Sequence, residues 1–164
     1  MVMRILRHLL TPPWRVRVIL PRRSLRAIET AIRDSEAHHR GQILFAVEAS
    51  LDFVHLLRNV SARQRAVEVF SQLRVWDTEH NNGVLIYLLL ADRTVEIVAD
   101  RGVHTRVGVE SWEQICREME SFFQRNRFED GVIAGIKAVT RHLAHHYPGE
   151  GSTPNELPDT AVVL

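Results

Sequence analysis

The sequence has a single cysteine, Cys116, and a single lysine, Lys137, among its 164 residues. One cysteine excludes an intrachain disulfide and a cysteine-rich metal knot. Cys116 falls on the apolar side of a helical pattern, and no histidine stands near it in the sequence to activate it. We therefore expect an inert thiol in the core and not a nucleophile.

Long apolar runs are also missing. No segment approaches the ~18 to 20 apolar residues of a membrane helix, and the apolar residues at the start are interrupted by Arg4, Arg7 and His8 before Pro12 and Pro13. This start lacks the unbroken apolar stretch of an export signal. We expect a cytoplasmic protein with no stable membrane insertion.

A strong charge of either sign is absent as well. The net charge is +1, with 25% charged and 45% apolar residues, which is typical of soluble globular proteins and gives no reason to expect nucleic-acid binding. The first 26 residues nevertheless hold seven arginines and no acid. We expect a solvated basic arm over residues 1–21, and contact with an acidic or phosphate-rich surface is the alternative.

The length predicts one domain, since one core usually serves roughly 100 to 200 residues. We place it over residues 22–147. A tail over residues 148–164 is rich in glycine, proline and acid, so we expect it to be flexible, although its final "AVVL" is apolar enough to dock. The short amphipathic "RILRHLL" in the arm is expected to pack on the domain or fray, with contact to a membrane surface as the alternative.

Periodicity predicts the order of helices and strands. Apolar residues at three- and four-residue spacing indicate helices after Pro21 with Ser24 as N-cap, over 61–76 capped by Ser61, over 111–125 capped by Ser111, and from Phe128 to "HHYPG". Short apolar runs indicate strands at 43–47, at 84–91 and at 94–100, the last two forming a hairpin. "RVRVIL" is an additional candidate for an edge strand. The predicted fold is α/β: a three-layer sandwich with a mixed, mostly parallel central sheet of about four strands, including a hairpin, flanked by helices.

The middle of the chain carries a family resemblance. "ARQRAVEVFSQLRVWDTEHNNGVLIYLLLADRTVEIVADRGV" resembles the centre of a TPM domain: a helix ending in an "F..L" element, an asparagine-asparagine-glycine loop, an aliphatic strand, a D-R turn and a second strand. "GVIAGIKAVTRHLAHHYP" is similar to the last helix of the family. The resemblance covers roughly residues 24–147.

The resemblance implies an α/β sandwich of a kind found in bacterial envelope and plant chloroplast proteins. It also implies divalent-cation binding, with acid phosphatase activity in some members and assembly or repair of membrane complexes in others. Many members carry a signal peptide and a membrane helix, and we expect neither here. Where the family has a G-x-G-L-E type loop, this sequence reads Asp100-Arg101-Gly102-Val103-His104, so its ligands would differ.

Acids at the predicted strand ends are the candidate metal ligands. Ligands gather beyond the carboxyl ends of strands in open α/β sheets, and hard cations need several oxygens together. We therefore predict a Ca²⁺ or Mg²⁺ site, with a transition metal as an alternative because histidine could join it. The predicted ligands are Asp77, Asp92, Asp100, Glu48 and His104. The competing interpretation is that these acids only form turns and end strands.

Phosphatase chemistry would need a metal and positive charge on the phosphoryl oxygens. Arg93 and Arg101, each beside a candidate acid, are the predicted contacts to phosphate or to a partner. Histidines 142, 145 and 146 share a helix end, where the helix dipole already favours them.

Three functions therefore remain open at this stage. The first is divalent-cation binding, the second is a non-catalytic interaction module for a membrane-protein complex or another subunit, and the third is a weak metal-assisted acid phosphatase.

Overall fold

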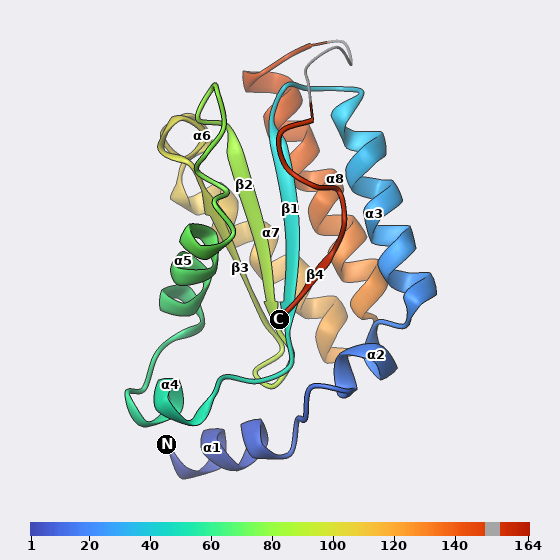
Figure 1. Ribbon diagram of the computed structural model, residues 1–164. Coiled ribbons are helices and arrows are strands. Elements are labelled where there is room, and N and C mark those ends of the chain that lie inside the picture. Colours follow the sequence, from blue (N-terminus) through green and yellow to red (C-terminus); the bar gives the residue numbers. More distant parts are fainter. Residues whose placement is uncertain (150–154) are drawn as a thin grey trace.

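A computed structural model describes residues 1–149 and 155–164. Its centre is a four-stranded sheet in the order β3-β2-β1-β4 (Figure 1). β1 pairs in parallel with β2 and with β4, and β2 pairs antiparallel with β3. The strands are β1 (Gln42–Glu48), β2 (Gly83–Leu89), β3 (Thr94–Ala99) and β4 (Val162–Val163). The predicted mixed sheet with a hairpin is confirmed.

Helices cover both faces of this sheet, which confirms the three layers. α3, α7 and α8 pack on one face, and α4 and α5 lie on the other (Figure 1). The helices are α1 (Val2–Leu9), α2 (Arg15–Ile19), α3 (Arg22–Glu36), α4 (Phe53–Leu57), α5 (Ala62–Gln72), α6 (Arg101–Val107), α7 (Val109–Gln124) and α8 (Phe128–His146). None of the helices in the described ranges is long and apolar enough to cross a bilayer.

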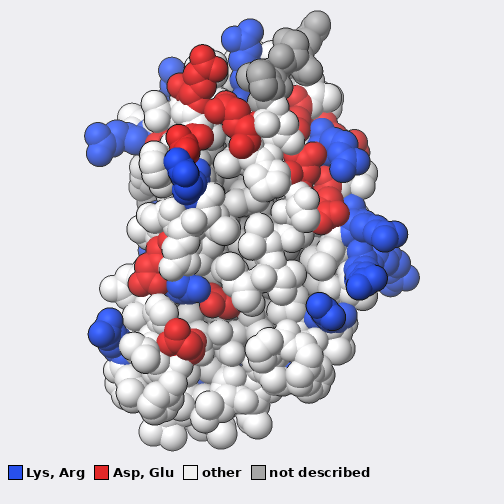
Figure 2. Space-filling view, in the orientation of Figure 1, with Lys and Arg blue, Asp and Glu red and all other residues white. Residues whose placement is uncertain are grey.

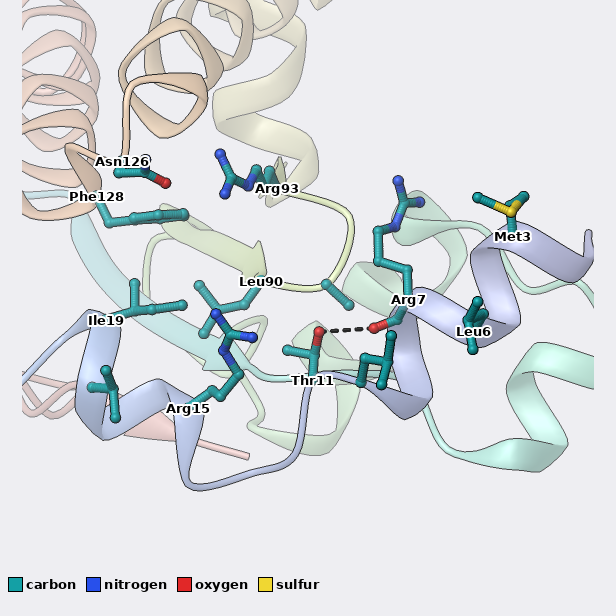
Figure 3. A pocket seen from close by; sticks show the side chains of 13 residues that line it. Met3, Leu6, Arg7, Thr11, Arg15, Ile19, Leu90, Arg93, Asn126 and Phe128 are labelled. Carbon is teal, nitrogen blue, oxygen red and sulfur yellow. Dashed lines mark hydrogen bonds between the residues drawn. The ribbon is translucent and has the colours of Figure 1, made fainter.

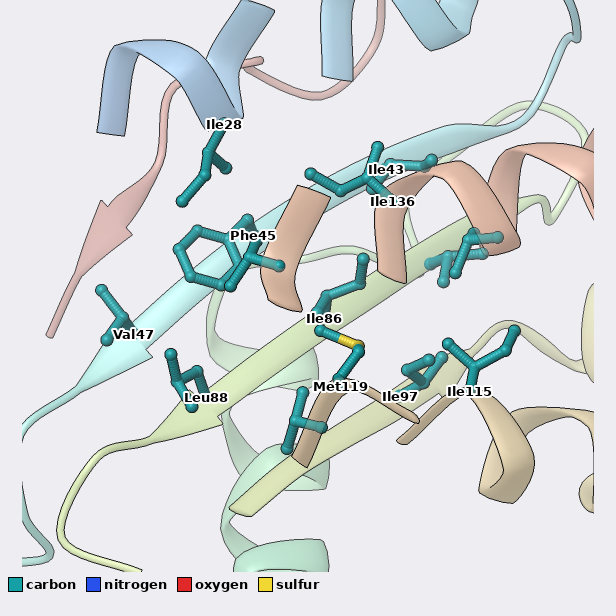
Figure 4. Packing of buried hydrophobic residues seen from close by; sticks show 14 of the residues in the cluster. Ile28, Ile43, Phe45, Val47, Ile86, Leu88, Ile97, Ile115, Met119 and Ile136 are labelled. Atoms are coloured by element: carbon teal, nitrogen blue, oxygen red, sulfur yellow. The ribbon is translucent and has the colours of Figure 1, made fainter. Parts of the chain in front are cut away.

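The long apolar run of the sequence is the central strand β2, whose seven residues are all buried. Successive side chains of a strand point to opposite faces, so a strand covered on both sides must be apolar throughout. Ile86 faces α7 and α8, together with Phe45 of β1 (Figure 4). Tyr87 faces α5 instead.

The chain ends differ from the expectation of a flexible arm and tail. "RVRVIL" is not an edge strand: residues 15–19 form α2, which buries Val16, and Leu20, directly after the helix, is also fully buried. The free edge of β1 is instead paired with β4, so the C-terminal "AVVL" docks on the sheet. Part of the predicted flexible tail, residues 150–154, lies outside the described residues.

Some helix starts were also predicted wrongly. Ser61 begins α5 with a capping box, as expected for its position before Gln64. Ser24, by contrast, is buried inside α3, which begins after Pro21. Ser111 lies within α7, which follows Gly108 directly. The reason is an extra helix, α6, which shifts the start of α7 towards the N-terminus.

Candidate functional site

The sheet separates the acids that the sequence grouped as one site. Glu48 is the last residue of β1, and Asp92 follows the carboxyl end of β2. Asp77 precedes β2, and Asp100 follows β3, where its amide N–H donates to the Gly83 carbonyl at the start of β2. Seven residues of β2 span roughly 20 Å at the usual rise of a strand. Asp92 therefore cannot share an ion with Asp100.

Asp92 anchors the N-terminal helix. Arg4 Nε donates to Asp92 Oδ2 over 3.1 Å, and Arg7 also donates to this carboxylate. His8 Nε2 lies 3.2 Å from Asp92 Oδ1, while His8 Nδ1 accepts a hydrogen bond from the Leu51 amide over 3.0 Å. The Asp92 side chain is only 11% exposed. Asp92 thus holds α1 against the end of the sheet through Arg4, Arg7 and His8.

The electrostatics of this anchor follow from burial and charge. Burial alone would raise the pKa of Asp92, but the charges of His8 and Arg4 and their hydrogen bonds hold the pKa below its usual range. Burial lowers the pKa of His8 despite the opposing effect of Asp92. The helix thus brings two arginines to a carboxylate that stays ionised.

Replacing Asp92 with asparagine is expected to loosen α1 and to lower the free energy of unfolding by about 1–3 kcal/mol, because two arginines lose a charged acceptor. The amide exchange rate of Leu51, whose partner is His8, should rise. The pKa of Asp92 is lower in the folded than in the unfolded chain. Its contribution to stability is therefore fully present above the pKa of the unfolded state, and it is lost as the pH falls through the pKa of the folded state. The difference between wild type and D92N should therefore shrink in acid.

The control for this variant is Asp77→Asn. Asp77 pairs with Arg74 on the surface, with both side chains more than half exposed, and such pairs contribute about 0–1 kcal/mol. Equal losses of stability in D92N and D77N, or unchanged exchange at Leu51, would contradict the anchor.

Glu48 is held by a buried network on the α5 side of the sheet. Arg65 donates to both of its carboxylate oxygens, from Nη2 to Oε1 over 3.0 Å and from Nε to Oε2 over 2.9 Å. The Tyr87 hydroxyl donates to Oε2 over 2.5 Å. Burial, and then the charge of Glu48, raises the pKa of Tyr87, and the hydrogen bond with Glu48 is the main cause that raises the pKa of Arg65. Glu48 holds the sheet to α5.

The other predicted residues are spread over different surfaces. His104 lines a groove between β3 and α7, together with Glu96 and Cys116. Burial raises the pKa of the Cys116 thiol to about 12, in agreement with an inert cysteine. Arg93 lines a second groove, between α1, α2 and the end of β2, and donates to the Phe123 carbonyl over 3.2 Å.

Asp100 lies in a pocket at the amino end of β2. The pocket has a volume of about 600 Å³, and His80, Asn81, Asp100, Gly102 and Tyr147 are among its lining residues; we call these five residues the Asp100 rim. Asp100 caps α6 by accepting a hydrogen bond from the Arg101 amide at Oδ1. Its other oxygen, Oδ2, is buried and has no hydrogen-bond partner among the described residues.

Oxygen atoms from three elements surround this pocket. A Cβ atom added at Gly102 would lie 3.0 Å from the Asn81 carbonyl oxygen and 3.2 Å from the Tyr147 hydroxyl oxygen, so both oxygens lie close to the backbone of Gly102. The neighbouring Asn82 is fully buried, and its Oδ1 is also without a partner within the described part of the chain.

Sequence reasoning missed Asn81, Asn82 and Tyr147 as site residues. The asparagine pair before a buried strand was a usable signal, because a buried amide must find partners. Tyr147 gave no signal, since only the fold brings the end of α8 to this rim.

Arg101 and Arg106 also line the pocket. Arg106 stacks on the Tyr147 ring at 4.7 Å and donates to the His146 carbonyl. Across the described residues, no three His, Cys, Asp or Glu side chains come together as a metal-binding group.

The topology defines the class of fold. It is a three-layer α/β domain with a parallel crossover from β1 to β2 and an antiparallel β2-β3 hairpin. The chain belongs to the TPM domain family, whose model matches residues 18–142. The predicted resemblance is confirmed.

Two solved structures share this fold. The NMR structure of the BA42 protein from the psychrophilic bacterium Bizionia argentinensis is 29% identical, with a TM-score of 0.75 over 85% of this chain and 92% of that one. The N-terminal domain of a protein from P. gingivalis is 18% identical, with a TM-score of 0.64 over 80% of this chain and 83% of that one. Among curated proteins, none matches the sequence.

Proposed function

We propose that this domain binds a divalent cation at the Asp100 rim. The observation that carries the proposal is the buried, unpartnered Asp100 Oδ2. Burying a neutral polar atom without a hydrogen-bond partner costs about 1–3 kcal/mol, and burying a charged oxygen in this way costs more. A bound cation would provide the missing partner.

The donor atoms at the rim favour a hard cation. Asp100 offers a carboxylate, Asn81 a backbone carbonyl and Tyr147 a hydroxyl oxygen, and Ca²⁺ takes such oxygen ligands from several elements. His80 lines the same pocket and would add the nitrogen that Zn²⁺ or Ni²⁺ prefers. The general expectation for the TPM family supports the same chemistry.

The charge of the rim sets the expected affinity. Asp100 is the single carboxylate among the pocket's lining residues, and Arg101 and Arg106 stand on the same wall. Affinity for Ca²⁺ rises with the number of charged ligands, so a dissociation constant on the order of 10⁻³ M is expected, at the weak end of protein sites. Binding then stabilises the fold by about 1.4 kcal/mol when the ion is at ten times its dissociation constant.

Calorimetric titration of the full chain with Ca²⁺, Mg²⁺, Zn²⁺ and Ni²⁺, together with melting curves, tests the proposal. Asp100→Asn should abolish the heat and the shift in melting temperature because it removes the charge at the rim. Asp77→Asn is the matched control, since Asp77 lies at the same end of the sheet but does not line the pocket; it should bind like wild type. Equal binding by wild type and D100N, or no binding at millimolar ion, would overturn the proposal.

A further inference from the structure

We propose that the end of the molecule formed by α1, α2 and α4 docks on an anionic lipid bilayer. Sixteen large hydrophobic side chains are exposed among the described residues, and eleven of them lie in residues 1–18 and 53–57. In Figure 1 these helices gather at one end of the sheet, and the face shown in Figure 2 carries few charged side chains there. The inference is independent of the cation site, which lies at the opposite end of β2.

The N-terminal helix turns two polar residues, His8 and Arg4, inward beside the partly buried Ile5. His8 is 2% exposed, and Arg4 turns in to Asp92. Met3 is 77% exposed and Leu10 is 64% exposed. A helix that only covered the domain would bury its apolar face and expose its arginines. The Asp92 anchor therefore fixes the aliphatic face of α1 towards the outside.

The exposed apolar residues form one surface. Met3, Leu6 and Leu10 of the α1 region share a groove of about 590 Å³ with Val18 of α2 (Figure 3). On the other side of α1, the His8 ring meets the Leu51 amide, just before α4. There the exposed side chains are Phe53, Val54 and Leu57. Exposed apolar patches of this kind mark sites of protein or membrane contact.

The charge around this surface selects the occupant. Arg7, Arg15 and Arg93 line the groove, and no acid does (Figure 3). The first 26 residues contain seven arginines and no acid. Asp92, close by, is already paired with Arg4 and Arg7. Two copies of this surface would bring arginine against arginine, which disfavours a dimer through this face.

An anionic bilayer satisfies both features. An interfacial helix buries its apolar face at the boundary of headgroups and acyl chains, while basic residues meet the lipid phosphates. Trp14, at the start of α2, is 64% exposed, and tryptophan favours this boundary. Arg93, predicted as a phosphate or partner contact, lies where headgroups would sit.

Co-sedimentation of the full chain with lipid vesicles tests this inference. Binding to vesicles with about one-third phosphatidylglycerol should exceed binding to pure phosphatidylcholine by at least roughly tenfold at low salt, since each arginine near the surface adds to the attraction. Arg15→Glu with Arg17→Glu should remove this preference, and Leu6→Glu with Leu10→Glu should remove binding. Val67→Glu, exposed on α5, is the control and should bind normally.

A second measurement needs no variant of the proposed surface. The Trp76→Phe variant keeps two tryptophans, the exposed Trp14 and the buried Trp112. Its tryptophan fluorescence should shift to the blue with anionic vesicles and be quenched by brominated lipid. No sedimentation and no quenching would overturn the inference. So would light scattering that shows a dimer in wild type and a monomer in the leucine variant, because the surface would then bind a second copy.

Discussion

Glu48→Gln is expected to lower the free energy of unfolding by about 3 kcal/mol, because the buried Arg65 then keeps only the half-exposed carboxylate of Glu68, 3.1 Å from its Nη1, as an ionic partner. Arg65 and Glu48 are each only 12% exposed. Glutamine keeps the shape of the side chain but not its charge, so the bidentate contact with Arg65 is lost. Urea unfolding followed by circular dichroism measures the change.

A matched control distinguishes this network from an ordinary ion pair. Glu113→Gln removes an exposed pair with Arg117, with N–O separation 3.7 Å, and should cost at most about 1 kcal/mol. Replacing the buried members of the network, with Glu48→Met, Arg65→Met and Tyr87→Phe, should cost less than E48Q alone, because the remaining charge, on Glu68, is 43% exposed. Similar losses for E48Q and E113Q would show that Glu48 is not a structural residue.

Gly83→Ala is the second large effect. A Cβ atom at this position would lie 2.1 Å from the backbone oxygen of Val75, and a backbone atom cannot move aside as a side chain can. Overpacking of this kind costs about 1–3 kcal/mol and occasionally more, and because the backbone oxygen cannot move aside we expect a loss of about 3 kcal/mol. The melting temperature should fall accordingly.

Gly135→Ala is the comparison within the same chain. Its Cβ atom would meet the sulfur of Met119 at 2.2 Å, but this is the flexible end of a side chain. Alanine in a helix also contributes about 1 kcal/mol over glycine. G135A should therefore cost much less than G83A. The reverse order would contradict the close approach of Val75 to the start of β2.

The core elements could be predicted because their local patterns agree with the tertiary structure. β2 is buried on both faces, so its unbroken apolar run identifies it, and β3 buries Val95, Ile97 and Val98 while Glu96 is only partly buried, as the alternation in its sequence indicates. The same holds for α8, whose apolar residues recur at helical spacing. "RVRVIL" misled because it alternates like a strand, whereas the edge it would have filled is occupied by β4, from the other end of the chain.

The candidate site was less predictable because ionic partners are set by the fold. Asp92 and Asp100 are eight residues apart in the sequence, yet a hairpin carries them to opposite ends of the sheet. The partners of Asp92 come from more than 80 residues away. No spacing rule connects Arg4 to Asp92, so an acid in a turn could not be recognised as the anchor of an N-terminal helix.

The two ends of the sheet differ in how their acids are partnered. At the carboxyl end of β2, Asp92 is neutralised by α1 and fixes an apolar, arginine-rimmed surface outward. At the amino end, Asp100 keeps one oxygen unpartnered within the described residues. The cation site that we propose is therefore limited to the Asp100 rim.

Addition of Mn²⁺ to the isotope-labelled chain, with amide signals recorded by NMR, tests most directly whether a divalent cation binds at the Asp100 rim. We expect the signals of residues 80–82 and 100–102 to broaden first, Ca²⁺ to compete for the site, and residues 91–93 and Glu48 to keep their signals. Broadening centred on Asp92 or Glu48, with the Asp100 rim unaffected, would contradict it.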